Sequence, residues 1–302
     1  ISIEEFMPDR IKVEVKIDKE EYAVGDSVNL RGLALNLFGP PAANRNYGVE
    51  MSLKHKRFGS KDFPYYTFSL ESQKKFGKTI TEGKTTTNGT FDAAFALPLE
   101  YANTGILAGK CFATVFDESG RPVNRIAPFE VVTQKEFVGI GALDRYVSTR
   151  SPIEVPLLAL NKEGKVLNNV EVMVQIVRYK WRTVLESANR GRYRYKSQKE
   201  EVVEKSENIM LNGANNVFQY QADYSGEYEV RVSVPGSKSY VKRSFYAYRW
   251  GDTQSTSFEV NQEGKIDINL DKDEYEVGQE AKILFKTPFN GRLLVTIERE
   301  EV

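Results

Sequence analysis

The chain has 302 residues, of which 42 are lysine or arginine and 42 are aspartate or glutamate, so its formal net charge is zero. This balance argues against a dedicated nucleic-acid binder, whose affinity depends on neutralising many phosphates. With 40% hydrophobic residues the chain can bury real cores, and its length favours two domains over one. No run approaches about 18 consecutive apolar residues, so the sequence predicts no insertion into a membrane.

The dominant periodicity along the chain is two residues, as expected for strands that bury one face. Turn signals rich in glycine, aspartate and asparagine separate the strand-like runs at intervals of about 8 to 12 residues. At most one short turn of helix is expected, within residues 97–107, because Pro98 limits it. Apolar and polar residues alternate most clearly in residues 11–17, 170–177, 228–234 and 266–270. The pattern predicts an all-β fold of tandem immunoglobulin-like antiparallel β-sandwiches.

A motif of eight residues occurs twice, at 18–25 and 271–278, with an offset of 253 residues (271 − 18). Each copy starts with Asp-Lys, carries a tyrosine at its fifth position (Tyr22 and Tyr275) and ends with Val-Gly. We expect the tyrosine to pack over a sandwich edge, equivalently in the two copies, and the glycine to allow a positive φ in the turn. A weaker copy lies at residues 143–147.

These three copies define the predicted domains. We expect one sandwich over residues 1–134, a second over 135–254 and part of a third over 255–302. The last stretch has room for only two or three strands, which is too few to close a sandwich. The sequence therefore predicts that the chain ends inside its third domain. The chain also begins without a methionine or a signal peptide and is expected to be part of a longer protein.

The single cysteine, Cys111, and the single histidine, His55, restrict the chemistry. One cysteine excludes an internal disulfide framework and a multi-cysteine zinc site. Cys111 lies in an apolar, β-prone run and is expected to be a small buried hydrophobic side chain. Ser/His/Asp or Cys/His catalysis would have to use His55, but no partner carboxylate and no Gly-x-Ser-x-Gly motif is present. We interpret His55 as a histidine of a surface strand or hairpin.

Three short motifs resemble known sites, and a structural interpretation is preferred for each. Asp271 and Asp273 begin like a calcium loop but lack its glycine and distal glutamate, so a solvated turn is expected. Residues 139–141 (Gly-Ile-Gly) lack the third glycine of a nucleotide fingerprint and are interpreted as a linker between sandwiches. Residues 88–90 (Asn-Gly-Thr) fit a glycosylation acceptor, but a hairpin turn is the simpler interpretation.

Residues 178–199 form the most unusual segment, with eight basic residues against one acid. Tyr179, Trp181, Tyr193 and Tyr195 are interleaved among them, a composition that could stack single-stranded bases or grip an anionic surface. Acidic residues follow at 200–207, so a hairpin would bring basic and acidic strands together as cross-strand pairs. We favour this self-paired hairpin over a surface for docking a partner, and both over a nucleic-acid site.

The order and spacing of further motifs resemble the bacterial branch of the alpha-2-macroglobulin family over essentially the whole chain. Residues 37–43 are similar to its Leu-Phe-Gly-x-Pro-Ala element, and residues 225–232 resemble its Gly-x-Tyr strand. The remaining segments that carry the resemblance are 4–13, 159–166, 178–181, 244–247, 275–278, 287–291 and 294–299. Residue 275 onwards looks like the opening of the domain that bears the bait region in this family.

The resemblance implies a protein that traps proteases: a protease cuts the bait region, the protein collapses, and a reactive thioester can capture the attacker. The thioester needs a Cys-x-x-Gln arrangement, and Cys111 is followed by Phe-Ala-Thr, so it is not that site. No evident bait region lies in these residues either. The expected function is that of a structural segment without catalytic residues, metal or cofactor. The expected partners are neighbouring domains and, through the whole protein, target proteases. The implied location is the cell envelope, periplasmic or secreted.

Two alternatives remain open at this point. A carbohydrate-binding or adhesive sandwich of a bacterial surface protein would use exposed aromatic residues, and the chain has 16 tyrosines. An enzyme is the third possibility, with a pair of carboxylates as its only route to catalysis.

Overall fold

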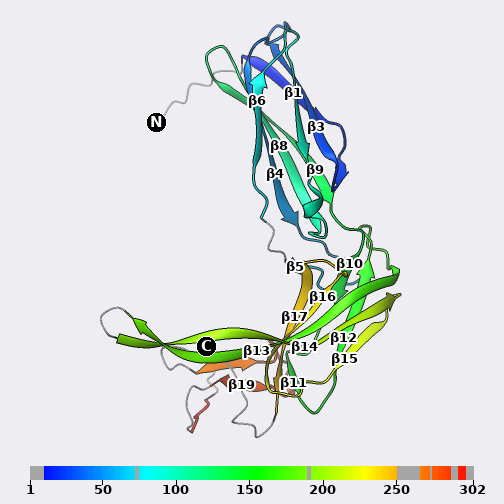
Figure 1. Ribbon diagram of the computed structural model, residues 1–302, viewed down its shortest axis with the longest axis vertical. Coiled ribbons are helices and arrows are strands. Elements are labelled where there is room, and N and C mark those ends of the chain that lie inside the picture. Colours follow the sequence, from blue (N-terminus) through cyan, green and yellow to red (C-terminus); the bar gives the residue numbers. More distant parts are fainter. Residues whose placement is uncertain are drawn as a thin grey trace.

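The computed structural model describes residues 10–71, 75–188, 192–249, 266–272, 274–286 and 292–296, and for residues 182–188, 192–197, 267 and 286 the backbone alone. Two β-sandwiches follow each other along the long axis of the molecule (Figure 1). The regular secondary structure of the described part of the chain is β-strand, with one 3-10 turn at Leu99–Tyr101 that follows Pro98. Both the all-β prediction and the short helical turn are confirmed.

The first sandwich packs a three-stranded sheet, β1-β3-β7, against a five-stranded sheet, β2-β9-β8-β4-β6. Inward and outward residues alternate, as in β7, where Phe91, Ala93 and Phe95 are buried and their neighbours are exposed. The buried residues of both sheets form one hydrophobic core. The strands are β1 (Ile11–Ile17), β2 (Glu21–Ala23), β3 (Ser27–Asn36), β4 (Asn46–Lys56), β6 (Thr79–Lys84), β7 (Thr90–Ala96), β8 (Ile106–Phe116) and β9 (Pro122–Val132).

The second sandwich has its own core and consists of sheet β10-β12-β15 and sheet β11-β17-β16-β13-β14. The short strand β5 (Leu70–Glu71), which comes from the first half of the chain, pairs with β17. The strands are β10 (Phe137–Ile140), β11 (Tyr146–Ser148), β12 (Ile153–Leu160), β13 (Asn168–Ala188), β14 (Arg192–Asn212), β15 (Asn216–Tyr220), β16 (Gly226–Ser233) and β17 (Tyr240–Tyr248).

Apart from β5, the two sandwiches have the same strand order. Sheet β10-β12-β15 corresponds to β1-β3-β7, and β11-β17-β16-β13-β14 corresponds to β2-β9-β8-β4-β6. In each sandwich the short strand that carries the tyrosine of the repeat pairs in parallel with the last strand, Tyr22 opposite Val131 and Tyr146 opposite Tyr246. The weak sequence copy at residues 143–147 is therefore a structural repeat.

A third copy of the same pairing begins with β18 (Asp267–Leu270) and β19 (Ile283–Lys286). Leu270 lies opposite Ile283, just as Ile17 lies opposite Leu30, and each residue of the later pair is 253 positions after its counterpart. Apolar side chains of this piece are exposed, Ile268 at 61%. A two-stranded sheet alone is only marginally stable, so this pair depends on what lies beside it.

The repeated motif forms the same hydrogen bonds in both strong copies. The Tyr22 hydroxyl donates to Asp18 Oδ1 at 2.5 Å, and the Tyr275 hydroxyl donates likewise to Asp271. Each carboxylate also accepts a backbone N–H eleven positions later, from Asn29 at 3.1 Å and from Lys282 at 2.9 Å. These bonds hold the pKa of both carboxyls below the usual range.

The final glycines of the two strong copies, Gly25 and Gly278, have φ of 89° and 94°, which confirms the predicted turn. The expectation of equivalent packing is wrong. The side chain of Tyr22 is only 2% exposed and meets Phe129 edge-on, with 5.4 Å between ring centroids. Tyr275 is half-buried, because the described part of the third copy supplies no second sheet to cover it.

The turn at residues 88–90 also needs a correction. Gly89 has φ of 73° and closes a turn through its N–H to the Thr86 carbonyl at 2.9 Å, so a turn is confirmed. It is not a hairpin turn, because β6 before it pairs with β4 whereas β7 after it pairs with β3 in the other sheet. The connection crosses between the layers of the sandwich.

The difference in burial between the two tyrosines leads to a first prediction. Tyr22→Ala is expected to lower the free energy of unfolding of the first sandwich by about 3 kcal/mol, because a buried ring is lost. Tyr22→Phe removes only the hydroxyl bond and is expected to cost about 1 kcal/mol. Urea unfolding followed by circular dichroism measures both, and Tyr275→Ala is the matched control, with a smaller effect. Equal losses for Tyr22→Ala and Tyr275→Ala would contradict the packing argument.

Candidate functional site

Cys111 and His55 lie in adjacent strands, β8 and β4, and have opposite environments. Cys111 is fully buried in the core of the first sandwich, and burial raises the pKa of its thiol to about 11. His55 is exposed, and its ring meets that of Phe76 at an angle of 62°, with centroids 5.0 Å apart. A buried cysteine and a surface-strand histidine are thus confirmed.

The other short motifs have structural roles as well. The Asp271 carboxylate is committed to Tyr275 and Lys282, and Asp273 lies outside the described residues. Across the residues with a described structure, no group of three histidine, cysteine or acidic side chains is placed to hold a metal ion.

The linker interpretation of residues 139–141 is wrong. Residues Phe137–Ile140 form the buried strand β10, which pairs with β12 in the second sandwich. A Cβ on Gly139 would lie 2.5 Å from the ring of Phe68, so this glycine allows an aromatic side chain from another part of the chain to approach the strand.

The basic segment is a hairpin, as predicted. Strands β13 and β14 pair from Asn168 opposite Asn212 to Ala188 opposite Arg192. The register shifts between Asn168 and Val170 and again between Ile176 and Val177. The half nearer the tip projects beyond the sandwich, to the left in Figure 1. Cross-strand charge pairing is confirmed where side chains are described: Arg178 Nε donates to Glu204 at 2.5 Å. Arg182, Arg190, Arg192, Arg194 and Lys196 lie outside the described side chains.

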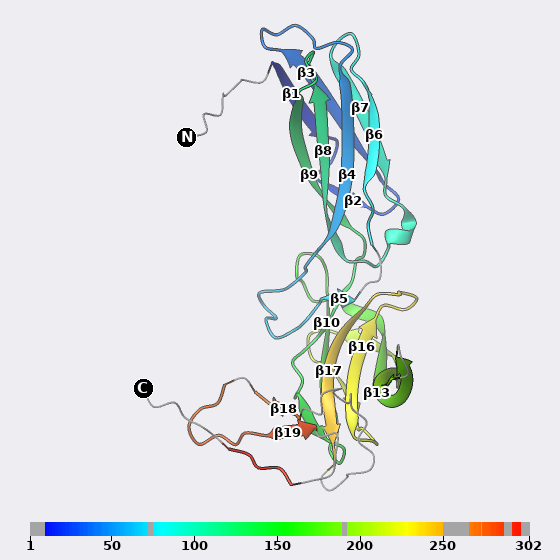
Figure 2. The ribbon, with the colours of Figure 1, turned by 90° about the vertical axis from the view of Figure 1, so that its left-hand side faces the viewer.

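The feature that the sequence did not reveal is the connection between β4 and β6. Its residues 57–71, which we call the strap, leave the first sandwich and lie on the second, where β5 ends the segment (Figure 2). Thr67 and Ile140 exchange both backbone hydrogen bonds, at 2.9 and 3.0 Å. Leu70 then lies opposite Val241 in antiparallel pairing with β17. The strap thus adds a strand to the neighbouring sandwich.

Aromatic side chains of the strap form an apolar cluster between the sandwiches. Phe68 is 4% exposed and meets Phe58 edge-on at 5.2 Å, while Phe58 stacks on Phe137 at 4.2 Å. Ile106 of β8 and Leu158 of β12 complete the cluster from the two sides. The strap is anchored by burial of these rings, each of which stabilises the junction by about 1.5–3 kcal/mol.

Ion pairs join the sandwiches on another side of the same junction. Lys162, in the turn between β12 and β13, lies 3.0 Å from Glu130 on β9 and also contacts Glu21 on β2. Lys56 contacts Glu130 from β4. Burial alone would raise the pKa of Glu130, but the bonds from the two lysines outweigh it and lower the pKa. Glu130 is therefore a shared anion between the two sandwiches.

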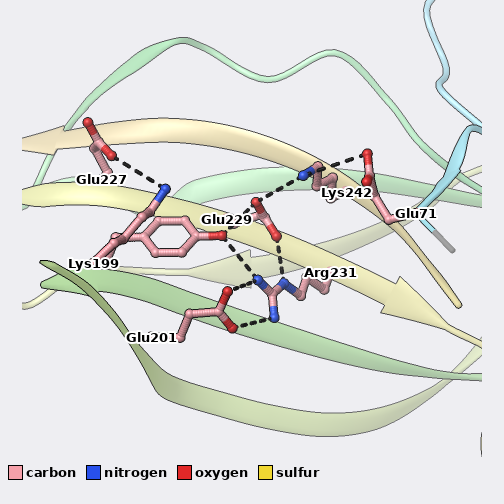
Figure 3. A network of polar contacts seen from close by, with 8 residues as sticks. Glu71, Lys199, Glu201, Glu227, Glu229, Arg231 and Lys242 are labelled. Carbon is pink, nitrogen blue, oxygen red and sulfur yellow. Dashed lines mark hydrogen bonds and ion pairs between the residues drawn. The ribbon is translucent and has the colours of Figure 1, made fainter. Parts of the chain in front are cut away.

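A polar network on the second sandwich continues from the strap (Figure 3). Its centre is Glu229 on β16, a carboxylate only 3% exposed. Glu229 accepts from the Tyr179 hydroxyl at 2.9 Å and from Arg231 Nε at 2.5 Å, and Lys242 Nζ lies 3.7 Å away. Lys242 also lies 3.6 Å from Glu71 of the strap. A buried carboxylate is tolerated here because two hydrogen bonds and a nearby lysine ammonium stabilise its charge.

The network ends in the hairpin. Arg231 binds Glu201 of β14 through two nitrogens, at 2.8 and 2.9 Å, and donates to the Tyr179 hydroxyl at 3.0 Å. The bond to Glu201 is the main reason why the pKa of Arg231 is raised. Lys199 Nζ lies 3.4 Å from the centroid of the Tyr179 ring, a cation–π contact. A chain of charges therefore connects the strap, the body of the sheet and the root of the hairpin.

This arrangement suits mechanical coupling, since its charged groups bind one another. The strap holds the two sandwiches in one orientation, and the network links the strap to the projecting hairpin. A sequence signal for the strap exists in retrospect: Phe58, Phe63, Tyr65, Tyr66 and Phe68 lie in a stretch with no strand periodicity, where a solvated loop would be polar.

A second prediction concerns the contact between strap and β10. Gly139→Ala is expected to displace the Phe68 ring and to accelerate amide exchange at Thr67 and Ile140 at least tenfold, because the added Cβ occupies the space of the ring. Gly59→Ala is the matched control, since a Cβ at this strap position meets nothing within 4 Å. Hydrogen exchange with mass spectrometry measures both, and equal exchange in the two variants would refute the close-packing role.

A third prediction concerns the centre of the network. Glu229→Gln is expected to destabilise the second sandwich by about 2–3 kcal/mol, because Lys242 and Arg231 lose a buried counter-charge. Glu201→Gln, at a half-exposed end of the network, is the control and is expected to cost about 1 kcal/mol or less. Urea unfolding followed by Trp181 fluorescence measures both. A loss of stability no larger for Glu229→Gln than for Glu201→Gln would refute the central role of Glu229.

In the comparison with known proteins, each sandwich matches a domain model of bacterial macroglobulins. The family model for the "Bacterial Alpha-2-macroglobulin MG5 domain" matches residues 9–132, and that for "Bacterial macroglobulin domain 6" matches residues 139–250. Within the described residues, no helix is long and apolar enough to cross a bilayer.

Curated relatives match nearly the whole chain. An alpha-2-macroglobulin of Pasteurella multocida is 24% identical over 311 residues, which cover 99% of this chain and 16% of that protein. An alpha-2-macroglobulin homolog of Yersinia pestis is 22% identical, covering 100% of this chain and 15% of that protein. The chain thus spans only a small part of the length of these relatives.

Solved structures agree with the fold. The native conformation of Escherichia coli alpha-2-macroglobulin matches with a TM-score of 0.55 and 15% identity, over 94% of this chain and 19% of that chain. Salmonella alpha-2-macroglobulin reacted with methylamine matches with a TM-score of 0.52 and 17% identity, over 94% and 19%.

Proposed function

Because the chain belongs to the bacterial alpha-2-macroglobulin family, we propose that it is a non-catalytic structural segment of an inhibitor that traps proteases. The segment comprises a macroglobulin-like sandwich over residues 1–134, a second over 135–254 and the start of a third over 255–302. The family matches at 9–132 and 139–250 and the repeated register of β18 and β19 support this division. The bait-bearing domain is then the third one.

The observation that carries the proposal is the strap. Two sandwiches joined by a peptide linker alone would reorient freely, whereas here one sandwich contributes a strand and an aromatic cluster to the other. Such a rigid pair can hold distant parts of a large protein in a strained arrangement and transmit a movement from one end to the other. This is the role that a trap requires of its scaffold after its bait is cut.

The proposal includes partners and location. The partners are the neighbouring domains of the same polypeptide and, through the whole protein, the target proteases. Catalysis, cofactors, nucleic acid and membrane insertion have no part in the proposed function of these residues. The proposed location is the cell envelope, either periplasmic or secreted.

A fourth prediction tests the function in the full-length parent protein. Addition of trypsin is expected to change its mobility on native gels, because bait cleavage releases the arrangement that the scaffold holds. Phe68→Ala is expected to move part of the population to the cleaved mobility before trypsin is added, and Gly59→Ala is not. A parent whose mobility trypsin leaves unchanged and which leaves trypsin fully active would overturn the trap. Specific binding of this chain on a glycan array would then favour the carbohydrate-binding alternative.

A further inference from the structure

The hairpin of the second sandwich and the strap of the first occupy the same position in the fold. Strands β4 and β6 of the first sandwich correspond to β13 and β14 of the second, so their connections correspond too. In the first sandwich this connection extends past the end of the sheet as the strap and lies on the next sandwich along the chain. In the second, residues 180–188 and 192–199 of the hairpin extend past the sheet (Figure 1).

The next sandwich along the chain from the hairpin is the third copy, which begins with β18 and β19. The strap binds the first strand of its neighbour at Ile140, six positions before the tyrosine of that copy, Tyr146. The corresponding position in the third copy, six before Tyr275, is Asn269. Asn269 and Leu284 line one groove together with Tyr179 and Lys199 from the root of the hairpin. The third copy therefore lies beside the root of the hairpin, and Arg145 and Tyr146 of the second sandwich line the same groove.

The charges of the two segments are complementary. Residues 178–199 contain eight basic residues and one acid, whereas residues 266–280 contain six acids and one lysine. The strap binds the second sandwich through backbone pairing and aromatic rings. The hairpin segment is positively charged, and the segment of the third copy beside its root is negatively charged. At its root Lys199 is held over the rings of Tyr179 and Trp181, at 3.4 and 5.3 Å from their centroids, beside the shared groove.

We propose that residues 180–188 and 192–199 of the hairpin are the docking arm for the third sandwich, which the arm holds through the acidic segment 266–280, as the strap holds the second. The occupant of this surface is thus a segment of the same polypeptide. The inference goes beyond the proposed function, because it follows from the repeat and the charges whether or not the parent protein traps proteases.

Hydrogen exchange of the 302-residue chain tests the arm. The pair β18 and β19 is too small to be stable alone, so protection of its amides reports what it is docked against. Replacing residues 182–197 by Asn-Gly keeps every strand pair between β13 and β16, which ends at Tyr179. This shortened chain is expected to exchange at least tenfold faster in residues 266–286 and unchanged in residues 137–160.

The double variant Lys180→Glu/Lys199→Glu tests the charge argument without removing backbone. If the shortened chain does not fold, this double variant is the test of the docking arm. It is expected to accelerate exchange in residues 266–286 at least threefold, while Lys110→Glu, at an exposed position of β8, leaves these residues unchanged. Phe68→Ala is the positive control for the method, with faster exchange in residues 137–140 and 240–241. Exchange in residues 266–286 that is equally fast in the native chain and the hairpin variants would overturn the proposal.

Discussion

The approach of Phe68 to Gly139 determines the geometry of the described molecule. The ring can lie against the backbone of β10 only because that position has no Cβ, and the contact places Thr67 where it can pair with Ile140. Once the strap pairs there, β5 reaches β17, and Glu71 reaches Lys242. This one close contact therefore sets the relative orientation of the two sandwiches. It also allows β5 to pair with β17 and the strap to reach the polar network through Glu71.

The two sandwiches share a topology but differ in the chemistry of the corresponding sheet faces. On the larger sheet of the first, Phe112 on β8 lies opposite Ile126 on β9, and both side chains are exposed, at 39% and 55%. On the larger sheet of the second, the buried carboxylate of Glu229 and the partly buried guanidinium of Arg231 occupy the middle strand. The fold therefore does not require the network. Its position between strap and hairpin indicates that it serves the connection between them.

Much of the fold could be predicted from the sequence because period-two patterns and repeated turns are local signals. The motif around Tyr22, its copy at Tyr275 and the weaker copy at residues 143–147 predicted where the repeats begin, and the motif predicted the positive φ of Gly25, since a short segment determines both. Burial was not predictable in the same way. Tyr22 is covered by Phe129 from a strand more than a hundred residues away, and nothing in the motif itself records whether such a strand is present.

The candidate site was missed for a related physical reason. The sequence indicates a linker at residues 139–141 because they lie where one predicted sandwich ends and the next begins, yet Gly139 is needed for a long-range contact with Phe68. The aromatic residues of the strap have no period because they pack on two bodies at once, not on one sheet. The basic hairpin and its cross-strand charge pairing could be predicted, because the basic and the acidic residues follow one another closely enough to form one antiparallel ladder. The particular pair of Arg178 with Glu204 could not, because Glu204 lies at the register shift next to Ile176.

A charge network has a different physical consequence from an apolar cluster at such a junction. Burial of rings is non-directional and fixes how strongly two bodies adhere, whereas hydrogen-bonded charges have a strict geometry and leave a costly unpaired group if one partner moves. In this chain both devices act together: the Phe68 cluster holds the sandwiches, and Glu229 connects Lys242, beside the strap, with Arg231, which binds the hairpin. A displacement of the strap takes Glu71 away from Lys242, so that Glu229 is the remaining partner of Lys242 in the network. Glu229 also binds Arg231, and Arg231 in turn binds Glu201 of the hairpin. Through this network, a movement of the first sandwich changes the strength of the ion pairs that hold the hairpin, which faces the third copy.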